Sequence, residues 1–293
     1  MNPSQEELLR EAAALAYERA PTLCPRDPAA GKCVLSHRIW PALRLLGLAV
    51  TPEHHAAFLT RALQRASSRT GSSPRVLLSG ASDFALLAIV LGALRARGLS
   101  PRVKVVDRCD TALLLNRLYA GRTGEAIDTE RSDILDYVPK ERFDIICTHG
   151  FLSYFPSAQR HGLAAKWLQL LHPGGSAILV NRLRPAPARA SGFAPGDSAR
   201  YVAEVERRAA SLDRPLPMAT QELAKLAAQQ ATDGVPAYPL RSEAELREVF
   251  SGAGFVIEQL ASEALPADSQ SSISGVAVPG DAPYAQLIAR KPG

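Results

Sequence analysis

Three polar residues capable of chemistry stand where short, mostly apolar stretches of the chain end. Asp107 ends RVKVVD, Asp133 lies in RSDIL, and His149 stands near the end of FDIICTHG. One carboxylate can accept hydrogen bonds from both hydroxyls of a ribose, and another can accept one from an exocyclic amine. Ile134, beside Asp133, can cover the face of an adenine. These residue types in this order indicate a nucleoside-binding site with an imidazole nearby.

Gly80 lies in a turn, SGASDF, that follows the apolar stretch RVLLSG. Small residues in such a turn let a ligand approach the backbone. A long apolar helix is predicted to follow, and its first N–H groups can bind a carboxylate or a ribose oxygen. His149 is expected to titrate near neutrality and to serve as a general base. In contrast, His54 and His55 are expected on an exposed helix surface.

Alternating strands and helices must position these residues. Continuous apolar strands that alternate with helices are typical of a parallel sheet covered on both faces. Ligands bind such sheets at the carboxyl ends of the strands. The pattern predicts strands at 75–80, 102–107, 125–133, 143–150 and 176–182, with helices at 84–98, 111–121 and 164–175. A last helix, 242–255, is capped by Ser242 and precedes two strands, 254–265 and 284–292, that can pair antiparallel.

Composition divides the 293 residues into two parts. Residues 1–73 form an N-terminal helical cap or lid that ends in the linker SSRTGSSP, and residues 74–293 form the sheet domain. The alternation pauses at 183–241, a Pro- and Ala-rich helical insertion after the fifth strand. A cap and an insertion could together enclose a small-molecule site, and the cap could equally provide a homodimer surface.

Charge and hydropathy exclude several classes of protein. The formal net charge is +5, with arginines spread along the chain, whereas nucleic-acid binding needs a clustered basic face. A membrane span needs about 18 or more apolar residues, and the richest run, FALLAIVLGAL, is shorter. The N-terminus is acidic and helical rather than a signal peptide. We therefore expect a cytoplasmic protein with no nucleic-acid or membrane partner.

The chain has four cysteines: Cys24, Cys33, Cys109 and Cys147. Cys24 and Cys33 could form a zinc site with His37, but no CxxC pair supports it. Buried free thiols in a reducing compartment are the favoured interpretation. We expect no metal site.

Five segments, in this order and at this spacing, resemble the class I S-adenosylmethionine-dependent methyltransferases: RVLLSGASDF, VKVVDRCDTALLLNRLYA, RSDILDYV, FDIICTHGFLSYFP and LQLLHPGGSAILVNR. The last helix and strand pair extend the match to the C-terminus. The resemblance implies an α/β fold with a Rossmann-like seven-stranded methyltransferase sheet and helices on both faces. It also implies S-adenosylmethionine as the cofactor. A nucleotide-dependent dehydrogenase is the competing α/β interpretation, but SGASDFALL lacks its GxGxxG.

Carried over by position, the resemblance implies roles for Gly80, Asp107, Asp133, Thr148 and His149, and the chemistry of neighbouring residues adds the other expected site residues. The cofactor-binding residues would be Gly80, Ala81, Ser82, Asp83, Asp107, Arg108, Asp133, Ile134 and Thr148. The catalytic residues would be His149 and Tyr154, since an aromatic face favours a sulfonium cation. Asn181 and Arg182 would bind the acceptor, and Arg182 would pair with a carboxylate group of that acceptor.

The turn after the first strand departs from the family pattern. The family has an acidic residue two positions before its first glycine, where this chain has Leu78. Ser82 and Phe84 replace two further glycines, and Asp83 is a candidate substitute for the missing acid. The adenosine half of the site therefore follows the family, whereas the methionine half does not.

Three functions fit this site. The first is a methyltransferase, of a kind typical of secondary metabolism, that uses a small-molecule acceptor and in-line displacement at the sulfonium methyl. The second is a carbon–sulfur lyase or cyclase of the azetidine-2-carboxylate synthase type, in which S-adenosylmethionine is itself the substrate and methylthioadenosine leaves. The third is a non-catalytic cofactor-binding or scaffold protein.

Overall fold

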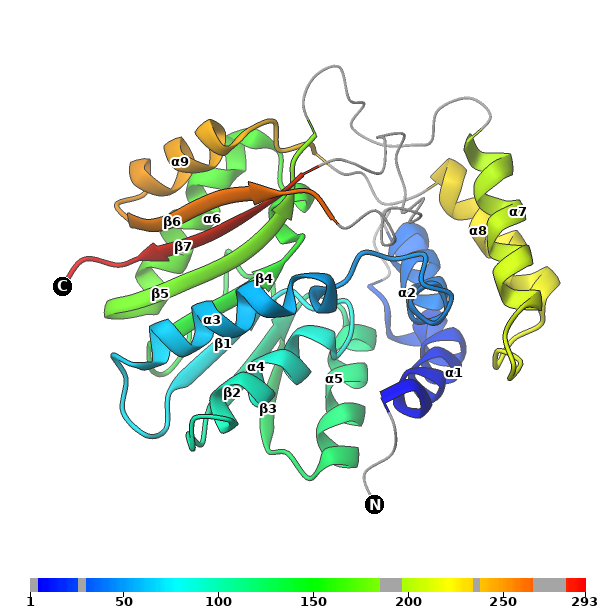
Figure 1. Cartoon of the computed structure of the whole chain (residues 1–293), viewed down its shortest axis with the longest axis horizontal. Coiled ribbons are helices and arrows are strands. Elements are labelled where there is room, and N and C mark those ends of the chain that lie inside the picture. The colour runs from blue at the N-terminus through cyan, green and yellow to red at the C-terminus, as the bar shows by residue number, and fades with distance from the viewer. Residues whose placement is uncertain (1–4, 26–29, 185–196, 234–237, 266–282) are drawn as a thin grey trace.

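The computed structural model describes residues 5–25, 30–184, 197–233, 238–265 and 283–293. Its centre is a seven-stranded sheet of order β3-β2-β1-β4-β5-β7-β6 (Figure 1). The strands are β1 (Arg75–Ser79), β2 (Arg102–Asp107), β3 (Ile127–Arg131), β4 (Phe143–His149), β5 (Leu171–Arg182), β6 (Val256–Glu263) and β7 (Tyr284–Arg290). The first five strands pair in parallel, and β7 pairs antiparallel with both β5 and β6. The predicted fold class and the antiparallel pairing of the last two strands are confirmed.

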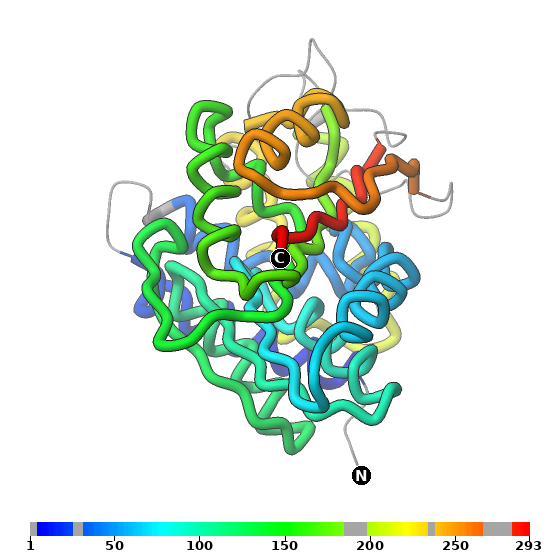
Figure 2. The backbone as a smooth tube through the Cα atoms, turned by 90° about the vertical axis from the view of Figure 1, so that its left-hand side faces the viewer, coloured from blue at the N-terminus to red at the C-terminus, as the bar shows by residue number. Residues whose placement is uncertain are grey.

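Helices cover both faces of the sheet, as its apolar strands require. On one face, α3 (Ala56–Ser67), α4 (Ala85–Arg95) and α5 (Asp110–Thr123) share a core that contains Leu63, Leu87 and Leu113. On the other face, α6 (Ser157–Leu170) and α9 (Glu243–Gly252) share a core around Trp167 and Phe250. Figure 2, which views the molecule from the C-terminal side, shows these layers on either side of the strands.

Four further helices gather beyond the end of the sheet that lies opposite the C-terminus (Figure 1). They are α1 (Gln5–Leu23), α2 (Ala30–Leu45), α7 (Asp197–Ala210) and α8 (Thr220–Asp233). A core that includes Ile39, Val205 and Leu223 joins α2, α7 and α8. Because β7 runs antiparallel to β5, the C-terminus marks the amino edge of the parallel strands. The four helices therefore lie at the carboxyl edge, where the site is expected.

The N-terminal helices α1 and α3 pack in different cores. Helix α1 packs its apolar face against Phe84 and Leu115 and so anchors the cap to the sheet domain. Helix α3, in contrast, contributes Phe58 and Leu59 to the core of the sheet itself. The division at residues 73 and 74, drawn from composition, stays a prediction.

Two helix starts follow directly from local sequence signals. The hydroxyl of Ser242 accepts a hydrogen bond from the Glu245 N–H, which confirms the predicted cap of α9. Thr51 precedes the 3₁₀ turn Pro52–His55 and forms a capping box with His54. None of the described helices is long and apolar enough to cross a membrane.

Candidate cofactor and acceptor site at the carboxyl edge of the sheet

The strand register brings the ends of β1, β2 and β4 to one level. Ser79 pairs with Val106, Leu78 pairs with Cys147, and the Gly80 N–H donates to the Val106 carbonyl at 2.9 Å. Gly80 has a φ of 74°, a left-handed conformation that glycine adopts without steric cost. The chain therefore turns sharply here, between the strand ends that carry Asp107 and His149.

Asp107 is held rigidly at the end of β2. Its Oδ2 accepts a hydrogen bond from the Ala81 N–H at 2.9 Å, and its Oδ1 accepts one from the Cys109 N–H at 2.8 Å. Burial raises the pKa of Asp107 to about 6, and the two N–H donors oppose that rise. Each oxygen has more than one acceptor direction, so the carboxylate can bind a ligand's hydroxyls while these contacts persist.

Asp133 and Arg108 come together from neighbouring strand ends. The Arg108 Nε lies 3.6 Å from Asp133 Oδ2, and Asp133 Oδ1 accepts from the Leu135 N–H at 3.0 Å. A cavity of about 220 Å³ lies beside them, lined by Pro25, Arg108, Arg131, Ser132 and Asp133. Ile134 is only 3% exposed and packs in the core on the α6 side. Asp133, the residue predicted to bind the adenine amine, thus borders a cavity. Ile134, predicted to cover the adenine face, packs against protein side chains instead.

Asp83 is engaged by the N-terminal cap. Its Oδ1 accepts from the Ala85 N–H at 2.8 Å at the start of α4. Its Oδ2 accepts from Trp40 Nε1 at 2.8 Å and lies 2.7 Å from Arg44 Nη1. Arg44 also pairs with Glu53. Arg44 and Trp40 are contacts that the sequence interpretation missed, because they lie about forty positions from Asp83 along the chain.

An aromatic ring lies directly over the turn. A Cβ added at Gly80 would stand 2.3 Å from two ring atoms of Phe151. The Phe151 ring also lies 5.2 Å from that of Phe155 and 6.4 Å from that of Trp167, centroid to centroid. Ser82, in contrast, is exposed. The turn is therefore covered at Gly80 and open at Ser82.

Two predicted site residues, Thr148 and Asn181, use side-chain polar atoms in hydrogen bonds within the protein. The buried hydroxyl of Thr148 donates to the Ser79 carbonyl at 2.7 Å and ties β4 to β1. Asn181 Oδ1 accepts from the Leu152 N–H at 3.1 Å. Asn181 Nδ2 is buried without a hydrogen-bond partner in the described chain. A buried polar atom of this kind has a free capacity that a ligand can satisfy.

His149 lies beside a second histidine, His55, which is buried. Its ring lies 5.4 Å from that of His55, which lies 4.8 Å from that of Tyr284. Burial and the neighbouring histidines lower the pKa of His149 to about 3, and burial lowers that of His55 to about 4. The expectation that His149 titrates near neutrality differs from this result, because the sequence does not show its desolvation. Within the described chain, its Nε2 is also buried without a hydrogen-bond partner.

The expectation for His55 is wrong, whereas that for His54 is confirmed. His55 is 5% exposed, and His54 is exposed as predicted. The reason is the 3₁₀ turn, which places the two side chains on different sides. His55 is turned inward toward β4 and β7, partners that are distant in sequence.

Tyr154 is accessible and feels the charge of Asp107. It is 52% exposed, and its pKa is raised, first by partial loss of water and then by the negative charge of Asp107. Its ring centroid lies 6.3 Å from that of Phe151. An accessible aromatic ring at this edge of the sheet suits a ligand contact better than a packing role.

Two arginines follow the end of β5. The guanidinium of Arg182 lies 6.0 Å from the ring centroid of Tyr284. Burial and the charge of Arg182 lower the pKa of Arg184 to about 10. Arginine side chains bind carboxylate and phosphate groups, so this end of β5 can contact an anionic ligand.

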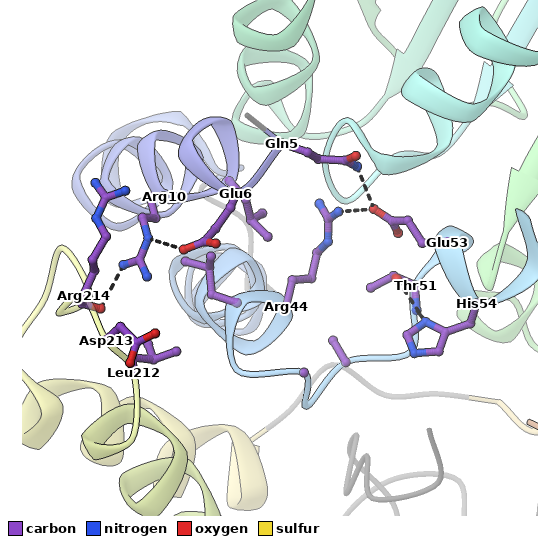
Figure 3. A pocket seen from close by; sticks show the side chains of 14 residues that line it. Gln5, Glu6, Arg10, Arg44, Thr51, Glu53, His54, Leu212, Asp213 and Arg214 are labelled. Atoms are coloured by element: carbon purple, nitrogen blue, oxygen red, sulfur yellow. Dashed lines mark hydrogen bonds and ion pairs between the residues drawn. The ribbon is translucent and has the colours of Figure 1, made fainter. Parts of the chain in front are cut away.

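A larger pocket, of about 620 Å³, lies among the helices that gather at this edge. Figure 3 shows that it is formed by α1, the end of α2, the segment that carries Thr51 and His54, and the loop at 212–214. Its lining is highly charged: Arg10 pairs with Glu6, and Arg44 pairs with Glu53. None of the predicted site residues is among the described residues that line it. Arg44 is the link, since it contacts both this pocket and Asp83.

Solved structures similar to this chain include several methyltransferases. The apo structure of the S-adenosylmethionine-dependent methyltransferase SibL matches with a TM-score of 0.51 at 17% identity, over 95% of this chain and 62% of that one. A protein provisionally described as a sarcosine dimethylglycine methyltransferase from Galdieria sulphuraria matches with a TM-score of 0.52 at 12% identity, over 81% of this chain and 85% of that one. A protein from Nostoc punctiforme, provisionally described as an O-methyltransferase, matches with a TM-score of 0.50 at 17% identity, over 96% of this chain and 67% of that one.

The fold is therefore that of the class I S-adenosylmethionine-dependent methyltransferases, as the sequence resemblance implied. No protein-family model matches the chain, and no curated protein matches it significantly. The chain spans about 62% of the length of SibL.

Proposed function

We propose that this chain is an S-adenosylmethionine-dependent methyltransferase that acts on a small, anionic acceptor molecule. The observation that carries the proposal is Asp107, fixed by two backbone N–H groups at the end of β2 in a sheet of methyltransferase type. A carboxylate held in this way is preorganised to receive two vicinal hydroxyls, and preorganisation reduces the cost of binding.

The adenosine half of the site fits the cofactor. Asp107 would bind the ribose, and Asp133 would accept from the adenine amine at the mouth of the 220 Å³ cavity. Arg108, which pairs with Asp133, would define the orientation of that carboxylate. When bound, S-adenosylmethionine supplies an electrophilic methyl group.

The methionine half would be organised from the cap. Asp83 already has three protein partners, so it would act by fixing the turn rather than by binding the ligand alone. Arg44 would connect the cap to the turn, since it pairs with both Asp83 and Glu53. Exclusion of water by the cap would favour an in-line transfer.

His149 would position the acceptor by a hydrogen bond rather than accept its proton as a general base. A pKa of about 3 makes its imidazole neutral and a weak base at neutral pH, but its Nε2 can still exchange a hydrogen bond. Arg182 and Arg184 would bind an anionic group of the acceptor at the end of β5. With these roles, the acceptor would lie beyond the carboxyl ends of β4 and β5.

The deciding experiment follows the fate of S-adenosylmethionine with the pure protein. We expect no turnover of the cofactor alone, and S-adenosylhomocysteine only when a pool of small aromatic and aliphatic carboxylates is added. Methylthioadenosine without any acceptor would instead establish the lyase or cyclase alternative, which no contact among the described residues specifically favours. Binding without turnover would leave a scaffold, and absence of binding to S-adenosylhomocysteine would overturn the cofactor assignment.

A further inference from the structure

Three cysteines and a histidine converge where the cap meets the sheet. Cys24 follows the last turn of α1, Cys33 and His37 lie one turn apart on α2, and Cys109 precedes α5. Their ligand atoms all lie within 4.8 Å of one another, in the part of the chain that the structure describes. The fourth member, Cys109, is the one that sequence reasoning could not add, because it lies 85 positions from Cys24.

We propose that these four residues bind one structural zinc ion. A tetrahedral zinc has Zn–S bonds of about 2.3 Å and Zn–N bonds of about 2.0–2.1 Å, which separate its ligand atoms by about 3.5–3.8 Å. The His37 Nδ1 lies 3.5 Å from Cys24 Sγ, 3.4 Å from Cys33 Sγ and 3.5 Å from Cys109 Sγ. Cys24 Sγ and Cys109 Sγ lie 3.4 Å apart. The cluster needs only small adjustments to match a zinc tetrahedron.

The chemistry of the donors selects the metal. Thiolate and imidazole are soft or intermediate ligands that favour zinc over magnesium or calcium. Four protein ligands leave no open position, so the ion would be structural rather than catalytic. Binding would release the thiol protons as the Zn–S bonds form, and no redox step is involved.

The arrangement is poorly explained without a metal. Thiols are weak hydrogen-bond partners, so three of them around one imidazole gain little from their mutual contacts. A disulfide between Cys24 and Cys109 would need an S–S distance of about 2.03–2.05 Å and would leave Cys33 and His37 without their partner sulfurs. Two other contacts do exist: the Thr111 hydroxyl lies 3.4 Å from Cys24 Sγ, and His37 Nδ1 lies 3.1 Å from the Cys33 carbonyl oxygen. The former is an outer-shell contact of the kind that orients metal ligands.

A zinc here would fasten the cap to the loop after β2, next to Asp107. Cys24, Cys33 and His37 come from the cap, whereas Cys109 comes from the loop after β2. The Cys109 N–H donates to Asp107 Oδ1 at 2.8 Å, so a metal that fixes Cys109 also fixes the carboxylate. This consequence for cofactor binding rests on the proposed function, but the metal site itself does not.

The test measures zinc in protein that carries no histidine tag and is purified under reducing conditions without chelator. We expect about one zinc per chain. Cys33→Ser should lower the retained zinc by about tenfold or more. Cys147→Ser is the matched control, since Cys147 is buried on β4 outside the cluster, and should retain zinc as the wild type does.

A second measurement uses the wild-type chain and so does not depend on how a variant folds. Cobalt(II) added to zinc-stripped protein should give the intense visible bands of a tetrahedral site and a thiolate charge-transfer band. Reduced wild-type protein that takes up neither zinc nor cobalt overturns the proposal. A Cys24–Cys109 disulfide in the isolated chain, or full zinc retention by Cys33→Ser, overturns it as well.

The same samples separate this proposal from the proposed function. If zinc binds and S-adenosylhomocysteine does not, the function fails and the metal site stands. If the cofactor binds equally well to metal-free chain, the fastening role fails. We expect stripping the zinc to weaken binding of S-adenosylhomocysteine measurably by calorimetry.

Discussion

Asp107 is the residue on which cofactor binding depends most. Removal of the carboxylate deletes charge-assisted hydrogen bonds, each of which contributes about 1.5–3 kcal/mol. We therefore expect Asp107→Ala to weaken binding of S-adenosylhomocysteine by about tenfold to a hundredfold, measured by calorimetry. Asp128→Ala is the matched control, because Asp128 is exposed on β3 and pairs with Lys104. Equal affinities in the two variants would contradict the ribose assignment.

The lowered pKa values of His55 and His149 make stability sensitive to acid. The unfolded chain protonates its histidines near pH 6.5, whereas these two protonate only near pH 4 and pH 3 when folded. Because the unfolded state binds more protons in that interval, the free energy of unfolding should fall as the pH drops from about 6.5 toward 4. Denaturant titrations at several pH values measure this slope.

A substitution tests which histidine carries the effect. His55→Gln should flatten the acid slope, since the variant has one fewer group whose pKa differs between the folded and unfolded states. His172→Gln alters an exposed histidine and should leave the slope unchanged. An unchanged slope in His55→Gln would show that His55 does not contribute to the acid sensitivity and would leave His149 as its source.

At the scale of elements, the turn after β1 has the strictest steric requirement. Gly80→Ala would put a methyl group 2.3 Å from the Phe151 ring and would hold alanine at a φ of 74°. The left-handed conformation alone costs a non-glycine residue about 1–2 kcal/mol. We expect a lower melting temperature together with weaker cofactor binding.

The matched control for this substitution is Gly162→Ala in α6. No heavy atom lies within 4 Å of an added Cβ there, and alanine favours a helix by about 0.5–1 kcal/mol over glycine. The control should therefore melt at the same temperature or higher. If Gly80→Ala behaved like Gly162→Ala, the close contact with Phe151 would not constrain the turn.

Helix α2 is tied to the same turn by a buried ion pair. The side chains of Arg44 and Asp83 are 4% and 3% exposed. Removal of one partner leaves an uncompensated buried charge, which costs about 3–5 kcal/mol. Arg44→Met should lower the free energy of unfolding by that order, whereas Arg122→Met, in an exposed pair with Glu11, should change it little.

At the scale of the whole molecule, a bound cofactor should stabilise the folded chain. A ligand at about 100 times its Kd adds about 2.7 kcal/mol, so S-adenosylhomocysteine should raise the melting temperature. NAD is the control, because the turn after β1 lacks a dinucleotide fingerprint. An equal shift with NAD would point to a general nucleotide site.

Features set by neighbouring residues could be predicted from the sequence, and features set by distant contacts could not. Strands such as β1 and β4 are continuous apolar runs, and Ser242 caps a helix through a bond to a residue three positions away. The burial of His55 depends on Tyr284, and the commitment of Asp83 depends on Arg44. These contacts form only when the whole sheet and cap assemble.

The candidate site likewise contains features that could be predicted from the sequence and features that could not. The positions of Asp107 and Asp133 at strand ends follow from the order of strands along the chain. Their surroundings, such as the cavity beside Arg108 and the low pKa of His149, depend on which elements pack over the edge. Residue type and strand position therefore indicate a ligand site, but not its electrostatics.

The turn after β1 also has a built-in optical reporter. The chain contains two tryptophans, and both indole N–H groups are bonded to this turn. Trp40 donates to Asp83 at 2.8 Å from the cap side, and Trp167 donates to Ser79 at 3.0 Å from the opposite face of the sheet. Because indole emission changes with the polarity and hydrogen bonding of the ring, any ligand that shifts residues 79–83 should change the protein's own fluorescence. Occupancy of the turn can therefore be followed in real time without a label.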